Sequence, residues 1–312
     1  MGGSGGTGFF RNGVDIDSLQ RKLRAAEEHT KDETYEQELA GHINELLVQY
    51  NDRDVDKIDT YLGTIREALE EDIEGTIDLR FGGSVYKHTY VDGLSDIDCL
   101  VLLKDPGLES LSPKEVLDYF KSKLEDRLKN VESIMIGDLA TTIRYEDGTE
   151  IQLLPAIRRG TGYVISTTGG EKWSSIIRPQ KFAEALTKVN QECGGKVVPT
   201  TKLVKAALAN LPERYKLTGY HIESLAIEVY KTYQGPRTTK PMLEYFFDKA
   251  QDLVLKHVKD KTGQSLNVDD YLGPENSTSR QAVSTEMNRI SRRMKNANAA
   301  RLSSEWLRTI GE

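Results

Sequence analysis

Two short segments, Gly-Gly-Ser at residues 82–84 and Asp-Ile-Asp at residues 96–98, constrain this chain more than any other part of its sequence. Asp96 and Asp98 stand at the start of an apolar run that is expected to form a strand. Side chains two residues apart in a strand project from the same face, so the two carboxylates should lie side by side. Neighbouring carboxylates repel one another unless a cation lies between them, and hard oxygen ligands suit Mg²⁺. The pattern therefore predicts a metal site formed by Asp96 and Asp98.

The Gly-Gly-Ser segment is expected to bind phosphate. Glycine lets the backbone approach a polyphosphate closely, and free N–H groups with the Ser84 hydroxyl can hold its oxygens. The segment is not a Walker-type loop, because no Gly-Lys-Ser/Thr ends it. Gly-Gly-Ser alone would favour a plain tight turn, but the succession strand, Gly-Gly-Ser, short helical stretch, Asp-x-Asp and apolar strand is far more specific. We therefore predict that Gly83 and Ser84 hold the phosphates, while metal ions on Asp96 and Asp98 clamp the oxygens of a phosphoryl displacement.

Hydrophobic periodicity divides the chain into a helical start, a mixed α/β region and a helical end. Residues 15–75 have apolar positions at helical spacing with charges between them, as amphipathic helices do. Short strands and one helix are predicted between residues 76 and 154, and helices again beyond residue 179. The expected fold is α+β and bilobal, with a small mixed sheet, its helices, and a helical lobe that closes the nucleotide cleft. We predict a flexible N-terminus or tag at residues 1–14, N-terminal helices and a catalytic lobe at 15–177, and the helical lobe at 178–312.

Composition and charge limit the classes of function. The chain has 312 residues, 38% of them hydrophobic, which is enough for a sizeable core. It has no apolar stretch long enough to cross a membrane and no secretory leader, so we expect a cytoplasmic protein without a membrane partner. The net charge of −7 argues against a protein that mainly binds DNA. Cys99 and Cys193 lack the spacing of a disulfide framework or a zinc site.

Three further segments extend the pattern and indicate a family. Residues 150–156, Glu-Ile-Gln-Leu-Leu-Pro-Ala, look like the strand that supplies the third acid in polymerase-β-type nucleotidyltransferases. Residues 217–226 look like a second-lobe helix of the oligoadenylate synthases. Together with Thr-Gly-Gln-Ser at residues 262–265, they make the chain similar to the bacterial cGAS/DncV-like nucleotidyltransferases, or CD-NTases. The resemblance spans roughly residues 79–290, and its motifs are stronger in the first lobe than in the second.

The resemblance implies an enzyme that depends on Mg²⁺, with Mn²⁺ as an alternative cation. Its implied substrates are nucleoside triphosphates, ATP among them, and its product is a cyclic oligonucleotide second messenger used in anti-phage defence (CBASS). An effector activated by that nucleotide and a regulatory protein are the implied partners. The alternatives are linear nucleotide transfer, either 2′–5′ oligoadenylate-like or directed to RNA, and a non-catalytic nucleotide-binding module.

One departure from the family pattern concerns the third carboxylate. In the family this acid commonly lies three residues before the proline of the third-acid strand, where this chain has Gln152. An amide cannot act as a general base and is a weaker metal ligand. Glu150 points to the same face and is one candidate for the third acid, both as catalytic residue and as metal ligand. Otherwise two carboxylates suffice, or Gln152 is an engineered inactivating change. We favour Glu150, although a solvated hairpin residue explains it nearly as well.

Three residues of the second lobe are candidates for nucleotide binding. Lys202 and Lys205 lie three residues apart on a predicted helix, so they face one side of it. The resemblance implies that this helix approaches the triphosphate, where a lysine would neutralise negative charge. Tyr220 begins the next predicted helix and could stack on a base. A solvated helix face explains the lysines equally well, and buried packing explains Tyr220 as easily.

Overall fold

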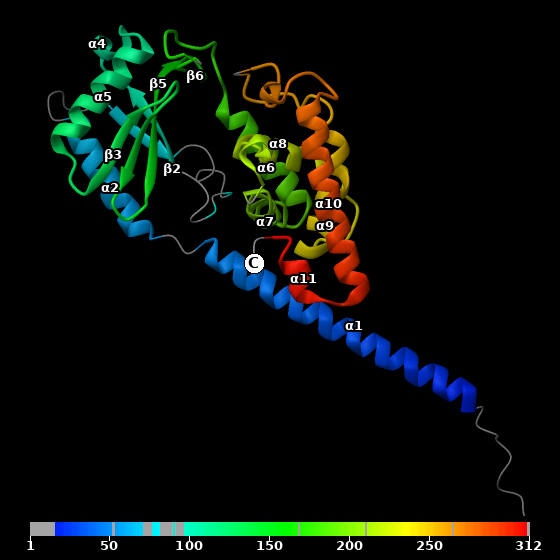
Figure 1. Ribbon diagram of the computed structural model, residues 1–312. Helices are drawn as coiled ribbons and strands as arrows, with labels where there is room; N and C mark the ends of the chain where they lie inside the picture. Colours follow the sequence, from blue (N-terminus) through cyan, green and yellow to red (C-terminus); the bar gives the residue numbers. More distant parts are fainter. Residues whose placement is uncertain are drawn as a thin grey trace, which may run out of the picture.

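The protein consists of a sheet lobe and a helical lobe that lie beside one another, with a long N-terminal helix whose first half extends away from both (Figure 1). The computed structural model describes residues 16–51, 54–70, 77–81, 89, 91, 97–167, 169–209, 211–263 and 265–310. Within these residues, no helix combines the length and the apolar character that crossing a membrane requires.

The sheet lobe is built on a mixed sheet. Its described strands are β1 (Ile77–Phe81), β2 (Ile97–Leu103), β3 (Val131–Ile136), β4 (Thr141–Tyr145), β5 (Glu150–Arg159) and β6 (Gly162–Ile165). Their order is β1-β2-β5-β4-β3, and β6 also pairs with β5. β2 and β5 run parallel, whereas all other neighbouring strands run antiparallel. The two strands with the candidate site residues are therefore neighbours in the middle of the sheet.

Helices cover one face of this sheet. The described helices of the lobe are α2 (Val55–Glu70), α4 (Pro106–Glu109) and α5 (Pro113–Arg127). α5 begins with a capping box, in which the Glu115 backbone N–H donates to the Ser112 side chain and the Ser112 backbone N–H donates to the Glu115 carboxylate. Apolar residues at alternate positions of β2, such as Cys99 and Val101, are fully buried in the same core as Phe120 of α5. The remaining β2 positions lie on the opposite face of the sheet.

The helical lobe has its own core. Its elements are α6 (Pro179–Glu192), α7 (Val197–Ala209), η1 (Glu213–Tyr215), α8 (Gly219–Tyr230), α9 (Thr239–Leu253), η2 (Asp270–Leu272), α10 (Thr278–Ala300) and α11 (Ser303–Leu307). The second half of α1 (Ile16–Gln49) belongs to this core, because Leu39, Ile43 and Leu46 are buried together with Trp306 and Ile310. The helix nearest the N-terminus is thus packed against the last residues of the chain.

The predicted α+β architecture, with a small mixed sheet and a helical lobe, is confirmed. The helical start predicted over residues 15–75 is two separate helices, α1 and α2, and β5 continues five residues beyond the predicted strand. β6 was not predicted from the sequence. It is only four residues long and follows a tight turn in which Gly160 has a positive φ of 56°, so its alternation is too short to recognise.

Candidate active site

Asp98 of β2 lies beside Gln152 of β5. The parallel register pairs Asp98 with Gln152, and the antiparallel register of β4 and β5 pairs Gln152 with Thr142. Paired residues on neighbouring strands project from the same face, so these three side chains form a row across the sheet. All three are half-buried, whereas Ile97 and Cys99 on the opposite face are buried beneath the helices. The carboxylate predicted to bind metal therefore lies on the face of the sheet opposite α2 and α5, which none of the described helices of its own lobe covers.

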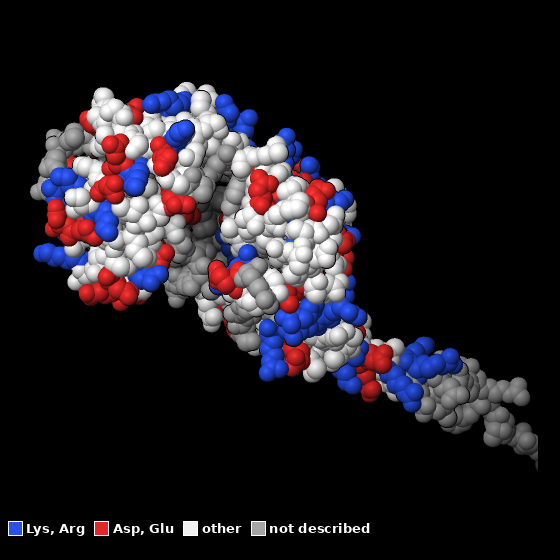
Figure 2. Space-filling model, turned by 45° about the horizontal axis from the view of Figure 1, so that its top comes forward, with Lys and Arg blue, Asp and Glu red and all other residues white. Residues whose placement is uncertain are grey.

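This face of the sheet borders the space between the two lobes. Figure 1 shows α2 and α5 on one side of the sheet and the helical lobe on the other, and Figure 2 shows a furrow between the lobes. A furrow of this kind is where a ligand held by both lobes would lie. Three predicted site residues, Gly83, Ser84 and Asp96, lie outside the described residues.

Glu150 shares the face of Gln152 but has a different partner. Its register partner is Arg144 on β4, and the Arg144 guanidinium donates two hydrogen bonds to Glu150 Oε2, at 2.8 and 3.2 Å. The Glu150 side chain is 22% exposed and the Arg144 side chain 45%. For Glu150 to bind a metal ion or accept a proton, this ion pair would have to open. The residue in register with Asp98 is Gln152.

Lys205 of α7 is held in a buried ion pair. Its Nζ is 2.9 Å from Glu223 Oε1 of α8 and 3.0 Å from the backbone oxygen of Thr89. The Thr89 hydroxyl donates to the same Glu223 oxygen. Thr89 and Glu223 are almost completely buried, and Lys205 is only 7% exposed. The three residues connect the segment between β1 and β2 to two helices of the other lobe, so phosphate binding by Lys205 remains a prediction.

We expect Lys205→Met to lower the free energy of unfolding by about 3–5 kcal/mol, the usual effect of removing one partner of a buried pair. The variant leaves the Glu223 carboxylate buried without its cation. Urea denaturation followed by circular dichroism measures the effect. The double variant Lys205→Met/Glu223→Leu should recover much of the loss, since it leaves no unpaired charge. Equal losses in the single and double variants would contradict the importance of this pair.

Lys202 and Tyr220 also have partners within the protein. Lys202 Nζ donates to the side chain of Asn51, just beyond the end of α1. The Tyr220 hydroxyl donates to Asp260 Oδ1 at 2.7 Å, and its ring lies 4.6 Å from that of Phe182. Burial and the bond to Asp260 raise the pKa of Tyr220. The structure thus places both side chains in contacts that join helices, and their binding of nucleotide stays a prediction.

Asp260 holds Thr262 and Ser265, the first and last residues of the Thr-Gly-Gln-Ser segment. Its carboxylate accepts hydrogen bonds from the backbone N–H groups of Thr262 and Ser265, at 2.7 and 2.9 Å. Although burial raises the pKa of Asp260, the bonds from Tyr220 and Thr262 lower it by more. The motif is therefore a turn built around one carboxylate, and sequence reasoning did not identify that residue.

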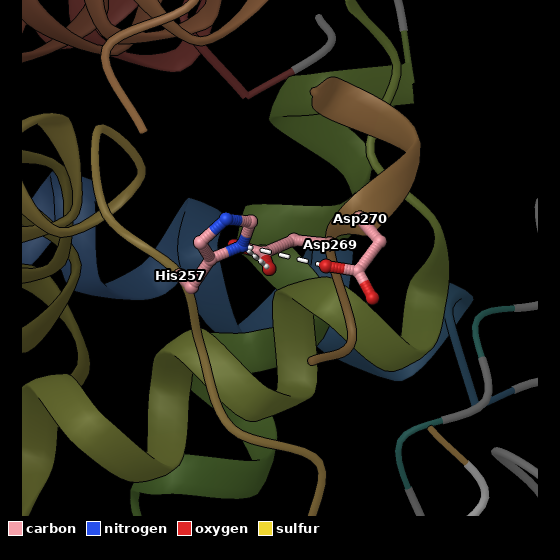
Figure 3. Close-up of side chains that lie close together, drawn as sticks. All are labelled: His257, Asp269 and Asp270. Carbon is pink, nitrogen blue, oxygen red and sulfur yellow. Dashed lines mark hydrogen bonds and ion pairs between the residues drawn. The ribbon is translucent and has the colours of Figure 1, made fainter. Parts of the chain in front are cut away.

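His257, Asp269 and Asp270 form a second group with the composition of a metal site (Figure 3). Their nearest ligand atoms lie within 4.8 Å of one another. The fully buried Arg280 already neutralises this group: its guanidinium lies 2.7 Å from Asp269 Oδ2 and 2.9 Å from His257 Nδ1. It also donates to the backbone oxygens at the start of the loop that follows α9. A bound cation would have to lie against a fixed guanidinium, so we interpret this cluster as structural.

His221 adds a titrating group to that network, and we expect it to make stability depend on pH. Burial lowers the pKa of His221 to about 4, because the opposing effect of Asp269 is smaller. Unfolded histidine gains its proton near pH 6.5, whereas the folded protein does so only near pH 4. Stability should therefore fall as the pH falls through this window, by about 3 kcal/mol between pH 7 and pH 4.

Urea denaturation across this pH range in the wild type and in His221→Gln measures that dependence. The variant should show a much flatter dependence, whatever its stability at neutral pH. The pKa of Asp269 is also lowered, chiefly by Arg280 once the cost of burial is overcome, and its contribution is lost only below about pH 4. A slope that is identical in the two proteins between pH 6.5 and pH 4 would contradict the role of His221.

Comparison with known proteins identifies the fold. No family model and no curated protein matches the sequence. Among solved structures, the chain is similar to the Vibrio cholerae DncV cyclic AMP-GMP synthase in complex with the linear intermediate pppA(3′,5′)pG. The two have a TM-score of 0.63 at 12% identity, over 94% of this chain and 89% of that one.

Two other solved structures have the same architecture. The CD-NTase CdnG of Bradyrhizobium diazoefficiens, in complex with GTP, has a TM-score of 0.60 at 17% identity, covering 81% of this chain and 89% of that one. The Escherichia coli MS115-1 CdnC, in complex with a HORMA protein, has a TM-score of 0.59 at 14% identity, covering 85% and 92%. The mixed sheet, the furrow and the helical lobe described above thus form the polymerase-β-like fold of the CD-NTases.

Proposed function

We propose that this chain is a Mg²⁺-dependent nucleotidyltransferase that joins nucleoside triphosphates into a cyclic oligonucleotide second messenger. The observation that supports this most strongly is the position of Asp98. It lies half-buried on the open face of a sheet whose fold is that of CD-NTases solved with nucleotides. Neither the charge of the chain nor its fold alone would single out this chemistry.

The residues of this face suit a hard divalent cation. Asp98 offers a carboxylate and Gln152, its register partner, offers an amide oxygen, both of which are oxygen donors of the kind that Mg²⁺ prefers. In our proposal Asp96 supplies the second carboxylate. The bound cation would stabilise charge on the phosphate oxygens and lower the pKa of an attacking hydroxyl. The donor set is therefore compatible with the proposed cofactor.

The proposed reaction is attack of a ribose hydroxyl on the α-phosphate of a nucleoside triphosphate. A phosphodiester bond forms between the ribose oxygen and the α-phosphate, and the bond from the α-phosphate to the β-phosphate oxygen breaks. Pyrophosphate leaves with the electron pair of the broken bond, and the hydroxyl proton passes to water. Gly83 and Ser84 would hold the phosphates, and the lysines of α7, where they can be released from their present partners, would neutralise them. Repetition of the same step within a linear intermediate would close the ring.

The partners follow from the same proposal. DncV was solved with a linear intermediate built from adenine and guanine nucleotides, and CdnG with GTP, so purine nucleoside triphosphates are the proposed substrates. CdnC was solved bound to a HORMA protein, which supports a regulatory protein as a further partner here. The product would act on a downstream effector in anti-phage defence.

Product analysis tests the proposal directly. The protein is incubated with all four ribonucleoside triphosphates and Mg²⁺, and the products are separated after phosphatase treatment. Cyclic oligonucleotides resist phosphatase because they have no terminal phosphate. We expect a phosphatase-resistant, Mg²⁺-dependent product that is sensitive to a phosphodiesterase. A linear product would instead support oligoadenylate-like transfer. Nucleotide binding without any product would support the non-catalytic module.

A further inference from the structure

The first half of α1 is solvent-exposed along the whole of its described surface. Every side chain described between Arg21 and Thr34 is exposed, and Tyr35 is the first buried one among the described side chains of the helix. Figure 1 shows this part of α1 extending beyond the helical lobe. Helices of this length are marginally stable in water when nothing packs against them. A partner that covers this segment would therefore stabilise it.

An open groove lies where the exposed half of α1 meets the body. Its volume is about 660 Å³, and Leu23, Tyr35 and Arg301 are among the residues that line it. Leu23 is 55% exposed, and its chain neighbours Lys22 and Arg24 are charged. Two ion pairs, Asp32 with Arg301 and Glu36 with Lys240, tie the helix to the body at this point. At one end of the groove, two ion pairs therefore fix α1 to the body, and at the other end Leu23 is exposed.

The charges along this helix are divided into two blocks of opposite sign. Residues 21–24 contain three basic side chains and no acidic one. Residues 27–38 contain six acidic side chains and a single lysine, Lys31. A parallel pair of such helices would place like charges together, whereas an antiparallel pair places each basic block beside an acidic block. The sequence of α1 is therefore complementary to itself in one orientation only.

We propose that two copies of this chain associate through an antiparallel pairing of their α1 helices. Leu23 of each copy packs into the groove of the other, against Thr34 and Tyr35. In this register Arg24 of one copy faces Glu33 of the other, and the contact occurs twice because the pair has two-fold symmetry. The surface lies apart from the furrow between the lobes, so the proposal is independent of the catalytic function.

Charge reversal on α1 provides the test, with mass measured by analytical ultracentrifugation across a dilution series. One variant carries Arg21→Glu, Lys22→Glu and Arg24→Glu; the other carries Glu28→Lys, Glu33→Lys and Glu38→Lys, leaving the carboxylates that hold Arg301 and Lys240 intact. We expect the wild type to form dimers, each variant to be monomeric, and an equimolar mixture of the two variants to form a heterodimer. Recovery in the mixture cannot arise if the variants are merely misfolded.

Leu23→Asp should also give a monomer, because it places a charge in the groove. The matched control is Lys188→Glu/Lys231→Glu, which changes two exposed lysines of the body and should leave the dimer unchanged. A wild type that stays monomeric at every concentration, or dimers that survive Leu23→Asp, would overturn the proposal. So would a mixture of the two charge variants that fails to associate.

Discussion

Asp98→Ala is expected to reduce nucleotide incorporation to background, a loss of at least about 10²–10³-fold, the range for removing one preorganised electrostatic group from an active site. Asp98 is the described carboxylate on the open face of β2, in register with Gln152. Without it, the proposed metal site keeps at most one strong ligand from this strand. Asp96→Ala and the double variant Asp96→Ala/Asp98→Ala are expected to show the same loss. The initial rate of pyrophosphate release measures the effect.

The matched control for this prediction is Asp118→Ala. Asp118 is an exposed acid on α5, on the side of the sheet away from the furrow, so its removal changes the net charge equally without touching the site. The thermal unfolding of all variants should remain close to that of the wild type, because Asp98 is only half-buried. Turnover near the wild-type rate in a folded Asp98→Ala protein would show that the site lies elsewhere.

Gln152→Glu is expected to raise the rate of nucleotide transfer steeply, by a factor of about 10²–10⁴ if the new carboxylate acts as general base. We expect this gain because residue 152 is in register with Asp98, so that a carboxylate at residue 152 would lie beside the proposed metal site. Initial rates of pyrophosphate release with saturating nucleotide and Mg²⁺ measure the gain. Gln152→Met, which is similar in size and cannot ionise, is the control and should give no gain.

Glu150→Gln tests the competing assignment. The sequence favours Glu150 as third acid, but the ion pair of Glu150 with Arg144 weighs against that choice. We expect this variant to retain most of its activity and to lose no more than about 1 kcal/mol of stability, as is usual for partly exposed pairs. Should Glu150→Gln abolish turnover while Gln152→Glu has no effect, Glu150 is the working acid after all.

The main features of the fold could be predicted because they depend on local patterns. The apolar run of β2 and the Ser-Pro start of α5 at Ser112 indicate their elements directly, and the positions of these elements agree with the sequence within a few residues. The pairing of β2 with β5 could not be predicted in the same way. It brings together residues about fifty positions apart, and only the packed sheet fixes which of Glu150 and Gln152 lies beside Asp98.

The partners of charged side chains were the least predictable part of the site. Sequence spacing correctly placed Lys202 and Lys205 on one helix, yet both amino groups bind within the protein. Glu223 is part of the motif at residues 217–226. Its pairing with Lys205 could not be predicted, because it depends on the packing of α7 against α8. The available indication in the sequence was a glutamate among the apolar residues Ile222, Leu225 and Ala226, since a carboxylate that such a position buries is rarely without a cation.

The packing of α1 against the C-terminus has a consequence for the order in which the protein can fold during synthesis. Tyr35 donates a hydrogen bond to Asn298, and Tyr50 donates one to the backbone oxygen of Ile310, so these contacts span more than 250 residues. The ribosome must therefore synthesise Asn298 and Ile310 before these two hydrogen bonds of α1 can form. Leu39, Ile43 and Leu46 share their core with Phe246 of α9 and Trp306 of α11, so this core is complete only once both helices have been made, whereas the sheet lobe has all of its described strands by Ile165. We expect a nascent chain that stops before α11 to have a folded sheet lobe and an α1 helix whose apolar face is still partly exposed. A chaperone would be needed most at this stage of synthesis.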